Sequence, residues 1–161
     1  MTRRLLTFAL LAALALPAAS AARDRSSGDG TLSVRDGRGI VVVSGRGGAI
    51  GSFARGSVTI SDPIDGDGTG PIVMGDDFPP KERDADTTTW RGNKVRFRII
   101  GGTFTIRVQG RGINLSFVGK ATVKLNGMDD PDGDGVFAAN GSAYTPIPAL
   151  PVSFPLTAQS P

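Results

Sequence analysis

This 161-residue sequence lacks histidine and cysteine, and aromatic residues make up only 6% of it. Without histidine the chain has no usual general base, no Ser-His dyad and not the commonest zinc ligand. Without cysteine it has neither a thiol nucleophile nor a disulfide, so its core must hold the fold by itself. The few aromatics also give little stacking surface for nucleic acid. We therefore expect a protein that is not an enzyme and does not bind nucleic acid.

Long apolar runs are also scarce. The one at residues 5–16 is too short to span a bilayer comfortably. Two arginines precede it, a proline follows it, and the small residues Ala19-Ser20-Ala21 come next. This order predicts a secretory signal peptide over residues 1–22, cleaved after Ala21 or Ala22. The mature protein is then expected to be secreted or held in the cell envelope.

The apparent basicity of the chain comes largely from this leader. Cleavage removes two of the 18 basic residues and none of the 15 acidic ones, so the net charge falls from +3 to +1. Bulk charge therefore gives no reason to expect a nucleic-acid partner.

The sequence does contain an internal repeat, in which residues 96–127 follow residues 31–62 at an offset of 65 positions. Gly45-Arg46-Gly47 matches Gly110-Arg111-Gly112, and the apolar positions match without a gap. Two copies are too few for a solenoid, which favours one pseudo-symmetric domain. The matched apolar pairs are Leu32–Phe97, Val34–Ile99, Val41–Ile106, Val43–Val108, Ile50–Leu115, Phe53–Val118, Val58–Val123 and Ile60–Leu125.

Both copies alternate apolar and polar residues with a period of two, as in Phe104-Thr105-Ile106-Arg107-Val108. This pattern indicates strands with one buried and one wet face. Asp36-Gly37 and Gly101-Gly102 are typical of tight hairpin turns. The expected strands are about 31–35, 39–44, 49–53 and 57–61 in the first copy, about 96–100, 103–109, 113–118 and 121–125 in the second, and short ones at 72–74 and 136–138.

The predicted fold is all-β, a single antiparallel β-barrel or β-sandwich of about 8–10 strands built from two tandem four-stranded copies. This β-domain would occupy residues 23–143, with residues 75–94 as a linker or surface loop. The segment 144–161 holds five prolines, so we expect at most an edge strand or an extended arm there.

An acidic, glycine-rich loop follows each copy. Asp130, Asp132 and Asp134 match the opening of a calcium-binding loop, but the twelfth position is Gly141 and no helices are expected around it. The loop after the first copy, with Asp65 and Asp67, fits less well. Calcium binding and plain turn formation are therefore the two interpretations of these loops.

Basic residues gather in the second copy, where residues 91–124 carry eight of them and no acid. Arg96, Arg98, Arg107 and Lys124 alternate with apolar residues, so they should share the outward face of the sheet. Such a face could bind an anionic cell-wall polymer or a membrane surface, or could simply keep the protein soluble.

The sequence thus favours an exported cell-envelope or extracellular β-domain with a binding or structural role. One alternative is a small hydrolase that uses loop carboxylates. Another is a repeated subunit of an extracellular assembly. The sequence does not decide among them.

Overall fold

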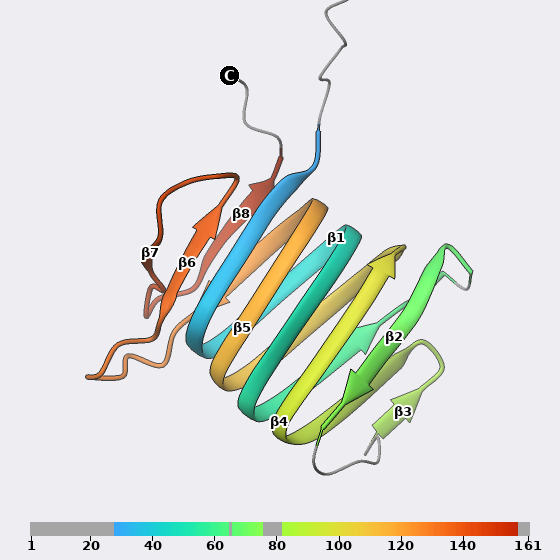
Figure 1. Ribbon diagram of the computed structural model, residues 1–161, viewed down its shortest axis with the longest axis horizontal. Coiled ribbons are helices and arrows are strands. Elements are labelled where there is room, and N and C mark those ends of the chain that lie inside the picture. The colour runs from blue at the N-terminus through green and yellow to red at the C-terminus, as the bar shows by residue number, and fades with distance from the viewer. Residues whose placement is uncertain (1–27, 65, 76–81, 158–161) are drawn as a thin grey trace, which may run out of the picture.

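The computed structural model describes residues 28–64, 66–75 and 82–157 (Figure 1), and every regular element in them is a β-strand. The signal peptide predicted over residues 1–22 lies outside these described residues. Within them, no helix is long and apolar enough to cross a membrane. The strands are β1 (Gly30–Ser61), β2 (Gly68–Met74), β3 (Glu82–Asp84), β4 (Thr87–Gly101), β5 (Thr103–Asn126), β6 (Val136–Ala139), β7 (Thr145–Pro146) and β8 (Val152–Leu156).

These strands form one open antiparallel sheet of eight strands, which confirms the all-β prediction. The main path runs β2-β4-β1-β5-β8, with β3 beside β4 and with β6 pairing both β1 and β7. The short strands expected at 72–74 and 136–138 are parts of β2 and β6. The proline-rich tail supplies β8, which pairs with residues 121–125 of β5 at the edge of the sheet, as expected.

The two longest strands wind around each other. Val41 of β1 pairs with Val108 on one side and with Leu125 on the other, and both partners belong to β5. In Figure 1 successive lengths of β1 and β5 pass alternately across the front and the back of the molecule. The front layer comprises residues 30–36, 48–54, 95–101 and 113–119 with β2, and the rear layer comprises residues 39–46, 55–61, 87–92, 103–110 and 120–126.

The predicted hairpins are wrong in their pairing. Asp36 and Gly101 do adopt positive φ, 48° and 75°. The strand segments on either side of each turn, however, do not pair with each other. Residues 31–34 pair with 115–118, and β4 pairs with β1 rather than with β5. The chain bends between layers instead of reversing within one. At Gly39, where φ is 121°, a Cβ would overlap the carbonyl oxygen of Asn126, so only glycine fits this bend.

The described part of the expected linker at residues 75–94 is also largely strand. β3 and β4 pair across a turn at residues 85 and 86, so residues 82–84 and 87–94 belong to the sheet. The run of three threonines in residues 87–89 explains this difference, since β-branched side chains suit a pleated surface better than an open loop.

Alternation places the apolar side chains of both layers in one cluster between them. Ile106, Val108 and Val123 are completely buried, whereas Arg107 and Lys124 beside them are exposed. The rings of Phe104 and Phe117 meet edge to face with centroids 6.2 Å apart, a contact worth about 1 kcal/mol beyond its buried area. The alternate side chains, most of them polar, therefore cover the outer surfaces of both layers.

Candidate functional site

The four basic residues predicted to form one surface lie on two. Arg96 and Arg98 project from β4 on the front layer, and both are exposed. Arg107 and Lys124 project from the rear layer. They pair with Val42 of β1 from its two opposite sides. The winding of the sheet separates the two pairs, because outward side chains of successive strand lengths face opposite sides of the molecule.

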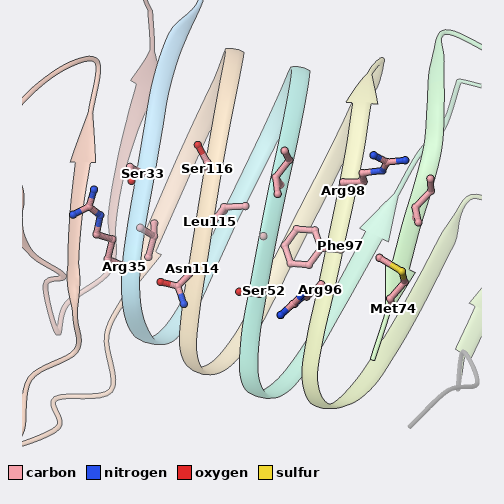
Figure 2. Close-up of a pocket in the computed structure, with 14 residues that line it drawn as sticks. Ser33, Arg35, Ser52, Met74, Arg96, Phe97, Arg98, Asn114, Leu115 and Ser116 are labelled. Carbon is pink, nitrogen blue, oxygen red and sulfur yellow. The ribbon is translucent and has the colours of Figure 1, made fainter. Parts of the chain in front are cut away.

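A groove of about 460 Å³ runs across the outside of the front layer. Figure 2 shows Arg96 and Arg98 on β4, Met74 beside them on β2, and Arg35 at the far side on β1. We call this feature the front groove. The residues that line it are Ser33, Val34, Arg35, Ile50, Gly51, Ser52, Ile72, Met74, Arg96, Phe97, Arg98, Asn114, Leu115 and Ser116.

Two cross-strand rows build the front groove. In one row Ile50 lies between Ser116 and Arg98, and in the other Ser52 lies between Asn114 and Arg96. Neighbouring outward side chains in these rows stand roughly 5 Å apart. The short serine side chains project little from the sheet and form the bottom of the groove. Ile50 is 66% exposed and offers an apolar contact.

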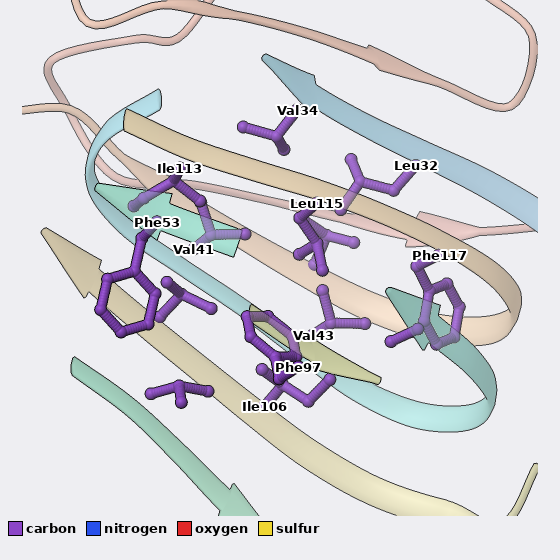
Figure 3. Close-up of a cluster of buried hydrophobic side chains, with 14 of the residues drawn as sticks. Leu32, Val34, Val41, Val43, Phe53, Phe97, Ile106, Ile113, Leu115 and Phe117 are labelled. Carbon is purple, nitrogen blue, oxygen red and sulfur yellow. The ribbon is translucent and has the colours of Figure 1, made fainter. Parts of the chain in front are cut away.

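The floor also depends on Gly51. A Cβ at this position would overlap the ring of Phe97, which packs against the glycine backbone from β4. Phe97 is buried and belongs to the core cluster drawn in Figure 3. The same aromatic residue thus supports the groove from below and fills the space between the layers.

The tail positions Arg35 at the far end of the front groove. Its guanidinium carbon lies 4.2 Å from the centre of the Tyr144 ring, a cation–π contact. The Tyr144 hydroxyl lies 2.7 Å from the Ser33 hydroxyl, which fixes the ring beside the groove. Sequence reasoning missed this arrangement, although the alternation of Val34 with Arg35 already placed Arg35 outward.

The described charged residues that line the front groove are all basic. Among the described residues, three arginines and no acidic residue line it. Most of the described acidic residues lie at bends and in loops instead, such as Asp36, Asp67 and the run after β5. The groove can therefore hold negatively charged groups against apolar and hydroxyl-bearing contacts.

The second acidic loop folds into a turn that its own carboxylates hold together. Asp134 is buried, and it accepts hydrogen bonds from the N–H groups of Asp129 at 2.9 Å and Asp130 at 3.3 Å. Asp130 accepts a bond from the N–H of Asp132 at 2.9 Å and pairs with Arg38 at 2.8 Å. These two contacts lower the pKa of Asp130 below its ordinary value of 3.8.

In the first acidic loop, Asp67 accepts a hydrogen bond from the N–H of Thr103 at 2.8 Å. It therefore holds the turn between β4 and β5. Asp65 lies outside the described residues. Within the described part of the chain, no three acidic, histidine or cysteine side chains are grouped so that they could hold a metal ion. Calcium binding by either loop stays a prediction.

Comparisons with protein-family models, with curated proteins and with solved structures gave no match.

Proposed function

We propose that this protein is an exported cell-envelope domain that binds a linear anionic wall polymer in its front groove. The observation that carries this proposal is the set of three arginines along a groove that, among the described residues, no acidic side chain lines. Charged groups of one sign at a recessed surface attract a partner of the opposite sign and orient it.

The spacing of the charges favours a polymer over a compact ion. From Arg35, the strand lengths follow in the order β1, β5, β1 and β4, so Arg35 and Arg96 lie three strand spacings apart, roughly 14 Å. Arg35 is held over the Tyr144 ring at one end, so a chain with repeated negative charges matches this spacing better than one phosphate or carboxylate does. Ile50, Ile72 and Met74 then offer apolar contacts to the backbone of such a polymer.

Export supports a wall polymer as the partner. The leader-like residues 1–22 carry the order of charge, apolar run and small residues that secretion requires. N-terminal sequencing of the protein recovered after expression of the full chain tests this part. A mature end after Ala21 or Ala22 is expected, and an intact Met1 would contradict export through a cleaved signal.

We also infer that the sheet closes into a β-sandwich built from two tandem copies. The offset of 65 positions supports the duplication, because it matches residues 30–36 of the front layer and 39–46 of the rear layer with residues 95–101 and 104–111 of the same two layers. Val43 and Val108 are one matched pair and Val58 and Val123 another, and all four are buried. The pair of layers around one core supports a sandwich rather than a barrel.

A retention experiment tests the polymer proposal. The double variant Arg96→Glu/Arg98→Glu would be passed over immobilised poly(glycerol phosphate) and polygalacturonate, which separate phosphodiester from carboxylate polymers. We expect affinity to fall by about tenfold or more, since two contacts of about 1 kcal/mol each become repulsions. Binding of the wild type should also weaken as salt rises.

The matched control is Arg46→Glu/Arg83→Glu, which changes the net charge equally at exposed residues outside the front groove. It should bind almost as well as the wild type. Equal losses in the two variants would reduce the effect to bulk charge and reject the groove. Retention on vesicles of an anionic phospholipid, without retention on either polymer, would identify a membrane surface instead.

A further inference from the structure

A second cationic pocket opens on the rear layer. Arg55, Arg91 and Arg107 line a cavity of about 660 Å³ together with Asn93 and Gln109. It shares no lining residue with the front groove. Arg55 belongs to β1, Arg91 to β4 and Arg107 to β5, so three chain segments far apart in sequence contribute one guanidinium group each. We call it the rear pocket.

The register of the rear layer directs these side chains outward. Ser57 pairs with Arg91 on one side and with Gln109 on the other, while Thr59 pairs with Arg107. Val58, between Ser57 and Thr59, is buried, as is Ile60, so the alternate residues face solvent. Arg91 and Arg107 therefore lie two strand spacings apart and two residues apart along the strand, roughly 12 Å, on one outer surface.

Within the part of the chain that the structure describes, no acidic side chain neutralises the charge of the rear pocket. No carboxylate lines it, and among the described residues none of its three arginines forms an ion pair. A smaller cavity elsewhere offers a contrast, since Arg46 and Lys120 share its lining with Asp29 and Asp67. Three unneutralised guanidinium groups with amide and hydroxyl donors suit an anionic group that can accept several hydrogen bonds.

We propose that the rear pocket is a second binding site for the same class of polyanion, so that one molecule bridges two polymer chains. This inference rests on the proposed function of the front groove. The two sites lie on opposite layers, with the apolar core between them, so a polymer in one leaves the other open. The domain then acts as a cross-link in the wall rather than as a simple ligand of it.

Calorimetric titration with short oligomers of glycerol phosphate and of galacturonate tests the number of sites. The wild type should bind two equivalents. Arg55→Ser/Arg91→Ser should bind one, and Arg96→Ser/Arg98→Ser should also bind one. Arg55→Lys/Arg91→Lys keeps the charge of the rear pocket and should still bind two, which guards against a folding defect as the cause. Circular dichroism would verify the fold of every variant.

Light scattering with the long polymers tests bridging directly. The wild type should cross-link poly(glycerol phosphate) or polygalacturonate into large particles, whereas each serine double variant should bind without doing so. Sedimentation of the free protein as a monomer would show that bridging does not come from protein dimers. Cross-linking by Arg55→Ser/Arg91→Ser at the wild-type level would overturn the inference.

The outcomes separate the two proposals. One equivalent in the wild type, lost in the front variant alone, would leave the front groove as the binding site and overturn the bridge. One equivalent lost only in the rear variant would overturn both the bridge and the assignment of function to the front groove. An absence of binding to either oligomer and either polymer would also overturn both.

Discussion

Gly51 links the core of this protein to its outer surface. Replacing it with alanine would drive a methyl group into the ring of Phe97. Overpacking of this kind costs about 1–3 kcal/mol, enough to lower the melting temperature of a domain of this size by several degrees. The control is Gly70→Ala in β2, where a Cβ would meet nothing within 4 Å. Thermal unfolding followed by circular dichroism compares them, and equal melting temperatures would contradict this packing.

The alternation of β5 gives a second test at the scale of single residues. Val123 is fully buried, and Thr122 next to it is exposed. We expect Val123→Asp to prevent folding, because an unpaired charge would be buried in the core. Thr122→Asp should melt close to the wild type. A Val123→Asp variant that unfolds as cooperatively as the wild type would show that the assigned phase of the strand is wrong.

At the scale of elements, the turn after β5 couples to a bend in β1 through Arg38 and Asp130. Because the folded pKa of Asp130 is lowered, its stabilising contribution is present above the ordinary value of 3.8 and is lost as the pH falls through the folded value. We therefore expect Asp130→Asn to lower the melting temperature at neutral pH, with a difference that closes in strong acid. Asp129→Asn is the control, and a difference that persists at every pH would contradict the ion pair.

The loop after β5 also allows calcium binding to be tested against turn formation. Asp134 and Asp130 already contact N–H groups and Arg38, so we expect calcium to leave the melting temperature of the wild type unchanged relative to a chelator. Asp134→Asn should destabilise the protein under both conditions. A rise with calcium that disappears in Asp132→Asn, whose carboxylate is exposed, would instead establish a metal site.

Period-two alternation predicted most strand positions and their buried faces, because side-chain direction in a strand depends only on local sequence. Phe97, Val108 and Val123 all lie inward as that pattern requires. The pairing of strands could not be predicted in this way. Glycine at a bend permits either a hairpin or a change of layer, and contacts between distant residues decide between them.

The candidate site was likewise predictable only where it depends on local sequence. Outward arginines were visible in the sequence, but their separation into two surfaces follows from the winding of β1 and β5. The contact of Arg35 with Tyr144 joins residues that the chain separates by more than a hundred positions. No local pattern in a proline-rich tail indicates that partner.

At the scale of the whole molecule, the ladder partners of β1 among the described residues all come from the second half of the chain. Its lengths pair with β4, β5 and β6 and not with one another. If the chain is divided between Ala85 and Asp86, at the turn before β4, neither half should fold alone, because the buried faces of β1 would lack the strands that cover them. The two halves mixed together should regain the circular dichroism spectrum and cooperative melting of the intact protein. Cooperative melting by either isolated half would instead mean that the copies are separate domains, and the pairing of β1 with β5 would then be an association of two domains rather than the basis of the fold.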